Sequence, residues 1–370
     1  MPAVTAEVLA DTLAVTATID DIPIPITRLG YQAKANTART VSFTVTSFEH
    51  ALLCKLGSKV EVQVGRDGVV SNLSFIGIIK RVQPTDEGAS VTAMDYITLL
   101  ATSTFVDYKI GDIIGRDLYF LASSAMNIDE IDTTFLTQGS GIKATAEMKL
   151  EGLQTRKEFI DKCFRHMYTF VEDATSYFDK LNIVYYQYAI HMSNRMDIMR
   201  VDPENIHSRP TLSISTTSNT VTDLEADYNT TLLVNSATVV SSTNDKIFFT
   251  YNDADSIAKY GVSSKLFTLQ TENLPMIMDE AQRYVNRYKE PIISYSIQLR
   301  NAEHLVVGDL VEVTAPLLST KHVLPISAYS IDTNNGLISS LTLGGKEASL
   351  SELIKLSLIH ISEPTRQAEI

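Results

Sequence analysis

Hydrophobic and polar residues alternate in short segments near both ends of the chain. Residues 60–64 and 293–300 alternate most regularly, with valine, isoleucine, tyrosine or leucine at every second position. A two-residue period is typical of strands with one buried face. Short turns rich in Gly, Pro and Asp separate the first strands, and this spacing is typical of a small barrel or sandwich. Further strands are predicted at 73–82, 90–94, 212–217, 234–240 and 247–251.

Two residues interrupt this first β-rich region. Gly77 falls inside the strand predicted at 73–82. A glycine in a strand often marks a bulge or a sharp bend, as at a barrel corner. Asp95 follows the strand predicted at 90–94 and is expected to begin a short helical turn through Leu99 and Leu100.

The middle of the chain changes to a helical period. Residues 116–126 carry apolar side chains at helical spacing. Thr155 and Glu158 form a capping-box pattern, which predicts a helix start. The helix that follows carries one apolar stripe made of Ile160, Cys163, Phe164 and Met167. With strands predicted at 168–170 and 183–190, the segment reads as a small α/β insert.

A further helix and a hairpin are predicted after residue 270. Asn273 is a candidate cap, Pro275 suits the first turn because its missing amide costs nothing there, and Pro291 ends the helix. The segment 334–336, Asn-Asn-Gly, predicts a tight hairpin between two apolar runs. The segment 253–261 is interpreted as a loop with a Tyr-Gly hinge that closes a β-segment. The segment 305–313 is interpreted as a strand, a Gly-Asp turn and a second strand.

These elements predict an α+β fold that is mainly β. Two small β-barrel-like modules would flank the α/β insert. The expected boundaries are 1–106 for the first module, 107–210 for the insert and 211–350 for the second module, which includes a helix at 275–289. Residues 351–370 are expected to be an artefactual tail.

The tail prediction rests on one short peptide. Residues 356–366 read Leu-Ser-Leu-Ile-His-Ile-Ser-Glu-Pro-Thr-Arg, which is the in-frame translation of a transposon-type sequencing adapter. Residues 367–370 would continue into the index. Such segments are excluded from fold reasoning. The native C-terminus would then be missing, and a natural amphipathic tail is the alternative.

Composition and charge narrow the classes of partner. The formal net charge is −13, and no basic run is long enough to indicate binding to nucleic acid. A soluble acidic protein is the preferred interpretation of this charge. The alternative is a surface that must not hold DNA, because an acidic surface repels phosphates. Cys54 and Cys163 are expected to be buried free thiols rather than a disulfide or a zinc site. No secretory signal and no membrane span is expected, so folding in a cytoplasm is predicted.

The sequence offers no convincing chemistry, and no catalytic residue, metal or cofactor is predicted. Cys163 and His166 could share a helix face as a dyad, but a helix-surface histidine is the preferred interpretation. The carboxylate groups at 20–21, 129–132 and 253–255 lie in turn-like surroundings, where Asp accepts local amides. Tyrosines at 185, 186 and 188 are interpreted as strand packing, with a binding surface as the alternative.

The order of several motifs resembles the tail hub proteins of bacteriophages, including baseplate hubs of contractile tails and late-control proteins. The matching segments run from about residue 56 to 345, and the insert matches least. They include a helix from Pro275 to Tyr288 and a set of single motif residues. The motif residues are Gly77, Asp95, Asn235, Asp255, Tyr260, Gly261, Gly308 and Asp309.

The resemblance implies a structural, non-enzymatic part of the virion tail tip or baseplate, assembled in the host cytoplasm. The resemblance also implies a trimeric ring, in which each subunit presents two related β-barrels to a sixfold tail tube. The implied partners are two further copies of the chain, the tail tube protein, a spike or tip protein, and distal tail or baseplate proteins. The ring would form part of the DNA channel, with an acidic lumen that lets the genome pass.

Two other functions stay open at this point. A tail-associated cell-wall hydrolase would need an acid pair or a Cys-His dyad, or a lytic domain in a missing C-terminus. A distal tail receptor-binding module would use the strand at 185–188 as its surface.

Overall fold

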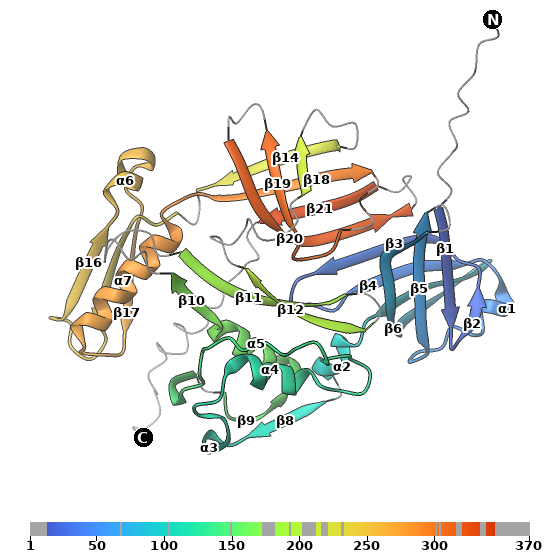
Figure 1. Ribbon diagram of the computed structural model, residues 1–370, viewed down its shortest axis with the longest axis horizontal. Coiled ribbons are helices and arrows are strands. Elements are labelled where there is room, and N and C mark those ends of the chain that lie inside the picture. Colours follow the sequence, from blue (N-terminus) through green and yellow to red (C-terminus); the bar gives the residue numbers. More distant parts are fainter. Residues whose placement is uncertain are drawn as a thin grey trace, which may run out of the picture.

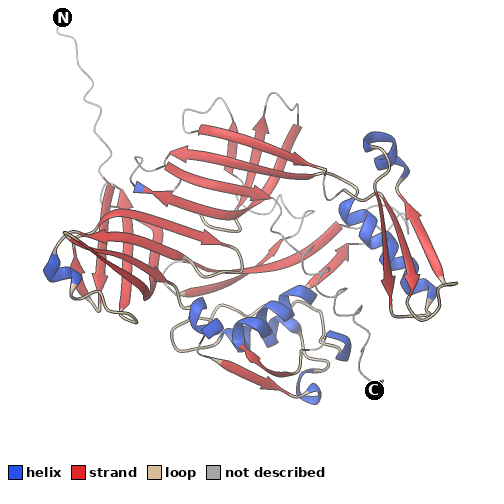
Figure 2. Cartoon of the chain, turned by 180° about the vertical axis from the view of Figure 1, so that it is seen from behind, coloured by secondary structure: helices blue, strands red, loops and turns tan. Residues whose placement is uncertain are grey.

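The computed structural model shows a mainly β chain built around one large sheet (Figures 1 and 2). It describes residues 13–66, 69–102, 104–148, 150–171, 182–191, 194–201, 212–215, 221–230, 233–300, 302, 305–315, 320–333 and 338–344. Within these residues the large sheet has 13 strands, and three smaller sheets accompany it. The predicted α+β, mainly β class is confirmed.

The first part of the chain supplies seven strands of the large sheet and two short helices. In β5, Val60, Val62 and Val64 are buried as the alternation predicts. The strands are β1 (Leu13–Ile19), β2 (Ile22–Ile24), β3 (Thr27–Lys34), β4 (Thr40–Val45), β5 (Lys59–Arg66), β6 (Val69–Thr85) and β7 (Gly88–Met94), and the helices are α1 (Phe48–Ala51) and α2 (Ile97–Thr102).

Gly77 lies in the middle of β6, a strand of 17 residues. Only glycine fits at this position without a shift of the backbone, because a Cβ atom there would lie 2.2 Å from the carbonyl oxygen of Met94 in β7. The register shift between β6 and β7 comes later, between Ile79 and Arg81. No register shift falls at Gly77 itself, so no bulge lies there, and the alternative of a sharp bend stays a prediction. The glycine permits close packing of two strands.

The last part of the chain completes the large sheet. Tyr295, Ile297 and Leu299 are buried on one face of β18, as the alternation predicts. The strands are β13 (Leu212–Ser215), β14 (Val221–Asn229), β18 (Ile292–Arg300), β19 (Leu310–Ala315), β20 (Thr320–Asp332) and β21 (Ile338–Gly344). β20 and β21 form the predicted hairpin, and its turn at 334–337 lies outside the described residues.

The two parts join through strands β3 and β20. These strands are antiparallel, with Ala33 opposite Tyr329 and Tyr31 opposite Ile331. The order β14-β18-β21-β20-β3-β4-β7-β6-β5-β1-β2 is continuous, and a single apolar core contains residues from both parts. The two strand groups are thus halves of one sheet, and Figure 1 shows them side by side.

Between these halves, the insert builds its own core under the sheet. Asp117 caps α4, and the capping box of Thr155 and Glu158 begins α5 as predicted. The stripe of α5 is buried, and the second core includes Ile76 of β6. The elements are β8 (Phe105–Tyr108), α3 (Ile110–Ile113), α4 (Leu118–Met126), a 3-10 turn (Ala146–Met148), β9 (Gly152–Thr155), α5 (Arg156–His166), β10 (Tyr168–Val171), β11 (Asn182–His191) and β12 (Arg195–Val201).

A small α/β unit branches from the last part of the chain, at the left in Figure 1. Helix α7 packs on a three-stranded sheet through Ile277 and Ala281. Asn273 stands at the N-cap without a side-chain cap hydrogen bond, and Pro275 lies in the first turn. The elements are β15 (Ser236–Ser241), β16 (Phe248–Asn252), α6 (Ala254–Tyr260), β17 (Ser264–Leu269) and α7 (Leu274–Tyr288).

The adapter-like peptide at 356–366 and the rest of the tail from 345 lie outside the described residues, as do residues 1–12. Among the described helices, none is both long enough and apolar enough to span a lipid bilayer.

Candidate functional site

Asp95 and Arg39 form a buried ion pair at the edge of the insert. Their side chains are 0% and 3% exposed. The Oδ2 atom of Asp95 accepts hydrogen bonds from Nε and the backbone N–H of Arg39, both at 3.0 Å. The Oδ1 atom accepts from the N–H of Ile97, so Asp95 also begins the helical turn that the sequence predicts. The guanidinium donates to the carbonyl of Ser74, which ties β4, β6 and β7 together.

The Gly308–Asp309 turn lies where the last part of the chain meets the insert. The N–H of Gly308 donates to the carbonyl of Ile326, and Oδ2 of Asp309 accepts from the N–H of Val306. Gly308 has a φ of +94°, and a Cβ atom there would lie 2.0 Å from Sδ of Met199 in β12. The glycine thus allows the turn to touch the insert. The turn and the strand after it are as predicted, but the segment before the turn is not a strand.

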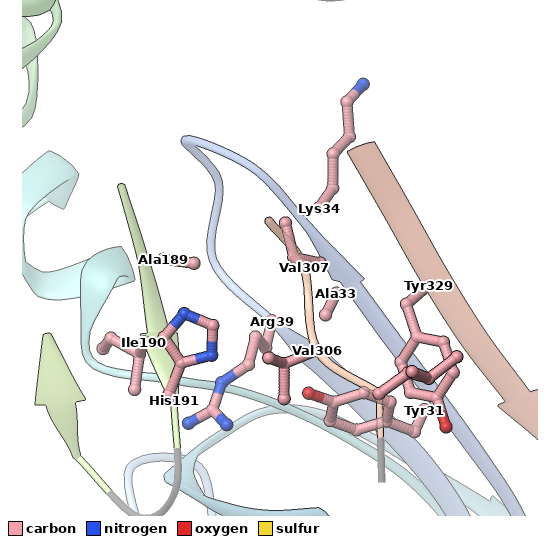
Figure 3. A pocket seen from close by; sticks show the side chains of 11 residues that line it. Tyr31, Ala33, Lys34, Arg39, Ala189, Ile190, His191, Val306, Val307 and Tyr329 are labelled. Atoms are coloured by element: carbon pink, nitrogen blue, oxygen red, sulfur yellow. The ribbon is translucent and has the colours of Figure 1, made fainter. Parts of the chain in front are cut away.

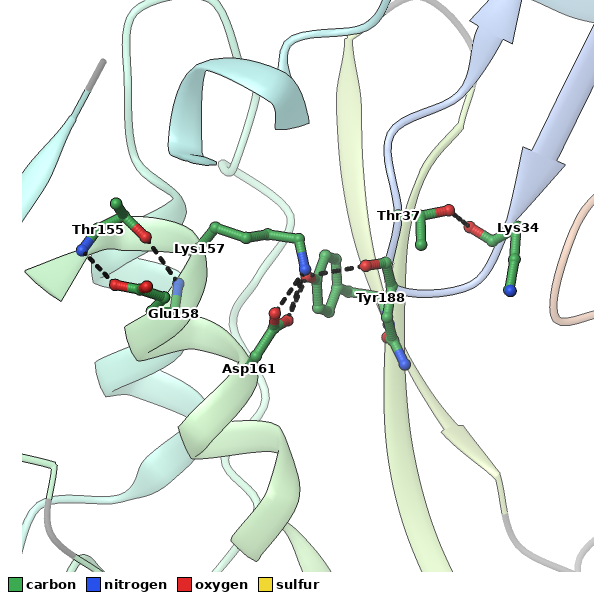
Figure 4. A network of polar contacts seen from close by, with 8 residues as sticks. Lys34, Thr37, Thr155, Lys157, Glu158, Asp161 and Tyr188 are labelled. Carbon is green, nitrogen blue, oxygen red and sulfur yellow. Dashed lines mark hydrogen bonds and ion pairs between the residues drawn. The ribbon is translucent and has the colours of Figure 1, made fainter. Parts of the chain in front are cut away.

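A hydrogen-bond network joins β11 of the insert to the turn between β3 and β4 (Figure 4). The N–H of Asn36 donates to the carbonyl of Tyr188, and the N–H of Tyr188 donates to Oδ1 of Asn36. The Tyr188 hydroxyl donates to Oδ1 of Asp161 at 2.7 Å. Lys157 forms an ion pair with Asp161, and its ammonium lies over the Tyr188 ring. Tyr188 is therefore a packed, fully buried link between insert and sheet.

A small cavity lies beside these contacts and is shown in Figure 3. It is a partly open space of about 20 Å³, which is room for one water molecule. Its lining comes from all three parts of the chain, including Arg39, His191 and Val306. Burial lowers the pKa of the His191 imidazole. We call this place, defined by Asn36, Arg39, Tyr188, His191 and Gly308, the three-way junction.

Asn235 organises a second cluster, in the small α/β unit. Its side-chain amide donates to the carbonyl of Gly261 at 2.7 Å and to the Ser256 hydroxyl, and its Oδ1 accepts from the N–H of Ser263. The residue is fully buried. Because every one of these contacts is local to the unit, Asn235 holds α6 against β15 and β17 rather than forming a binding site.

The segment around Tyr260 is a helix, and the interpretation of 253–261 as a loop with a β-closing hinge is wrong. Asp253 caps α6 by accepting from the N–H of Ser256, and Gly261 ends the helix at a φ of +79°. Burial opposes ionisation of Asp253, but the Lys289 ammonium at 2.9 Å and the Ser256 amide outweigh it, so its pKa is lowered. Asp255 is exposed in the first turn. The Tyr260 hydroxyl donates to Glu290.

The eight predicted motif residues therefore lie in separate places. Gly77 and Asp95 lie in the first half of the sheet, and Gly308 and Asp309 lie in the turn against the insert. The other four, Asn235, Asp255, Tyr260 and Gly261, lie in the small α/β unit. The structure brings Asp95 to the junction through Arg39, and sequence reasoning missed Arg39, Asn36 and His191.

The carboxylates and thiols act as structural groups. Asp20 and Asp21 both have positive φ in a turn, and Asp132 accepts from the N–H of Thr134 two residues on. Cys54 and Cys163 are buried and free, as predicted. Burial raises the pKa of the Cys163 thiol to about 12, so it is not a nucleophile at neutral pH. Within the described part of the chain, no group of three His, Cys, Asp or Glu residues could hold a metal ion.

No family model matches the sequence, and no curated protein matches it. Solved structures do. A prophage MuSo2 tail protein of 43 kDa from Shewanella oneidensis is similar at a TM-score of 0.58, with 13% identity over 90% of this chain and 98% of that one. The tail protein from Neisseria meningitidis MC58 is similar at a TM-score of 0.57, with 13% identity over 90% of this chain and 97% of that one. Prophage tail protein gp18 from Listeria monocytogenes EGD-e is similar at a TM-score of 0.53, with 13% identity over 94% of this chain and 99% of that one.

The chain has the fold of these phage tail proteins. The likeness runs through both halves of the sheet and the insert, since 90% or more of the chain is covered in each comparison.

Proposed function

We propose that this chain is a structural hub of a phage tail or baseplate. The observation that carries the proposal is the likeness to three phage tail proteins over almost the whole of each chain. The described residues offer an architecture rather than a reaction centre: one continuous sheet, an insert docked beneath it, and ionisable groups used in capping and pairing. A virion location at the tail tip or baseplate follows from the same proposal.

The proposed assembly is a ring of three copies. Each chain brings two curved halves of one sheet, so three chains bring six, which suits a sixfold tail tube on one side and a threefold spike or tip on the other. Head-to-tail contacts between identical subunits close into a ring when the rotation per subunit divides a full turn. The tail tube protein, a spike or tip protein, and distal tail or baseplate proteins are the proposed partners.

One face of the large sheet suits the wall of a DNA channel. On the side away from the core, side chains with hydroxyl or amide groups lie next to one another across six strands, β18, β21, β20, β3, β4 and β7. We call this the hydroxyl face, and it consists of Gln32, Thr40, Ser42, Thr92, Ser296, Gln298, Ser330, Ser340 and Thr342.

The nine residues of the hydroxyl face are uncharged, whereas the whole chain carries a formal charge of −13. Cations lie at its margins: Lys34 lines the same groove, and Arg81 on β6 lies opposite Thr92. A groove of about 400 Å³ hollows it at the joint of the two halves, where Gln32 lies opposite Ser330. The cores of protein interfaces are enriched in aromatic residues, Met and Arg and depleted in Ser, so this face does not resemble one. Because its own side chains offer hydroxyl and amide groups and the cations beside it are few, it suits a hydrated wall past which DNA slides. The proposed lumen thus carries few charges here instead of an acidic surface.

Mass measurement tests the ring. Light scattering on the purified full chain at several concentrations should give three times the mass of 40.9 kDa. A persistent monomer that also fails to associate with tail tube or baseplate proteins would contradict the hub proposal.

Spin labels test the channel wall separately. A cysteine at Ser340, in the hydroxyl face, and one at Thr268, an exposed position on β17, would each be labelled in the assembled ring. The native thiols are buried, so they should stay unlabelled. Labels at Ser340 should give the shorter distances between subunits in pulsed EPR, because residues near a threefold axis lie close together. Shorter distances at Thr268 in a ring of three would reject the channel wall while leaving the hub intact.

A further inference from the structure

Part of one face of the β11–β12 hairpin packs against the large sheet, and this face is buried at Gln187, Ala189 and Met199. Its residues alternate along β11 and pair across to β12, with Gln187 opposite Met199, Ala189 opposite Asp197 and His191 opposite Arg195. Met199 lies under the Gly308 turn, and Ala189 and His191 line the cavity of the three-way junction. The hairpin thus docks with a histidine at its contact surface.

His191 lies beside a fixed positive charge. Figure 3 shows its ring next to the Arg39 side chain. The Arg39 guanidinium cannot lose its proton at any ordinary pH. Its carboxylate partner, Asp95, is already engaged by two hydrogen bonds from Arg39 and one from Ile97. The Arg39 charge is therefore already balanced by the Asp95 carboxylate, and a proton on His191 would add a second positive charge with no free carboxylate from this pair to balance it.

The other ionisable groups around His191 act in both directions. Arg195 on β12 repels a proton on His191, whereas Asp197 on β12 and Asp309 in the turn attract one. Lys34, Tyr31 and Tyr329 also line the cavity, and burial raises the pKa of Tyr31, so it stays neutral. Burial of the imidazole is the largest effect, and the net result is a lowered pKa.

The docked position limits the hydration of a charged imidazole. His191 is half-buried, and the partly open space beside it, about 20 Å³, has room for a single water molecule, whereas a charged group in bulk water keeps a whole hydration shell. A protonated His191 is better solvated when the hairpin has moved away from the sheet.

We propose that His191 is a pH-sensitive latch that docks the β11–β12 hairpin on the large sheet when neutral and releases it when protonated. The detached histidine has the higher pKa, so the detached state binds more protons between the two values and docking weakens as pH falls. The latch goes beyond the hub proposal, since it concerns one chain and does not require a ring.

Hydrogen–deuterium exchange on the full chain tests the latch. After correction for the intrinsic effect of pH on exchange, protection of the β11 amides should fall between pH 7.5 and 5.5 more than protection of β20. The fall should not exceed about tenfold per pH unit, the limit for one proton. In His191→Gln the extra loss at β11 should disappear. Equal loss in the wild type and in this variant would overturn the proposal.

Two charge variants and one histidine control sharpen the test. Asp197→Asn removes an attraction and should move the midpoint of release to lower pH, whereas Arg195→Gln removes a repulsion and should move it higher. His166, at the end of α5, also has a pKa lowered by burial, but it lies outside the cavity lining. His166→Gln should leave release at β11 unchanged. The latch would be refuted if the pH midpoint of release stayed the same in both charge variants, or if the pH-dependent release disappeared in His166→Gln.

Discussion

Asn36 and Tyr188 are 152 residues apart in the sequence, yet they are joined by hydrogen bonds like neighbours in a ladder. Asn36 has a φ of +60°, a left-handed conformation that asparagine tolerates better than most residues. That conformation turns both its backbone and its side chain toward β11. The insert is thus attached to the first half of the sheet at the turn between β3 and β4.

Removing the Tyr188 hydroxyl should weaken this attachment. Tyr188→Phe loses the hydroxyl proton that is donated to Asp161 and shared with the more distant carbonyl of Asn36, and we expect the free energy of unfolding to fall by about 1–2 kcal/mol. Tyr260→Phe is the matched control, since its hydroxyl bonds an exposed carboxylate, and it should cost less than about 0.5 kcal/mol. Urea unfolding of both variants measures the difference. Similar losses in the two would argue against a linking role for Tyr188.

Breaking the buried ion pair from one side should be costly. Asp95→Ala leaves the Arg39 charge buried without its partner, and we expect a loss of about 3–5 kcal/mol. Replacing both residues, with Arg39→Met added, removes the uncompensated charge and should recover part of that loss. A double-mutant cycle by denaturant unfolding measures the coupling. Strictly additive losses would show that the pair does not act as a unit.

Gly77 and Gly111 should respond to alanine in opposite directions. In Gly77→Ala the new methyl group would meet the Met94 backbone at 2.2 Å, and overpacking of this kind costs about 1–3 kcal/mol or more. Gly111 lies in α3 with open space around it, so Gly111→Ala should stabilise by about 0.4–1 kcal/mol through the unfolded chain. Thermal unfolding compares them. A harmless Gly77→Ala would mean that β6 and β7 can separate without cost.

The Cys163 thiol should be inert in the folded protein. With a pKa of about 12, only about one thiol in ten thousand is ionised at pH 8, and the side chain is fully buried. Iodoacetamide at pH 8 should therefore leave Cys163 intact and should modify it rapidly once the chain is unfolded in urea. Rapid labelling under native conditions, followed by mass spectrometry of the peptide, would show that the α5 core opens readily.

Local patterns in the sequence were sufficient for the elements but not for the contacts. The capping box of Thr155 and Glu158 and the alternation in β18 depend on residues within one turn or one strand, and both are confirmed. The 253–261 segment misled the prediction because Asp is favoured both in turns and at helix N-caps, and here the cap prevailed. Helix α6 has only seven residues, too few for a clear period.

The three-way junction could not be predicted in the same way. Arg39 is in phase with the buried residues Val41 and Phe43 of β4, but a charged side chain does not by itself indicate burial, and its partner lies 56 residues away. His191 is the last residue of β11, and the strand is predicted from its other residues alone, so the pattern gives no separate indication of a role for the histidine. Contacts between distant segments depend on how sheet and insert pack, and a single sequence carries no local mark of that. Asp95 and Gly308 were identified because a helix start and a tight turn do carry local marks.

The pairing of β3 with β20 has a consequence for synthesis of the protein. A ribosome that has made residue 34 must add almost 300 more before β20 is complete, which takes roughly 15–60 s at typical elongation rates. Throughout that interval the edge of β3 waits without its neighbour. An unpaired edge is a template for joining the wrong chain. Nascent copies of this protein should therefore need shielding from one another on the polysome until the last hairpin emerges.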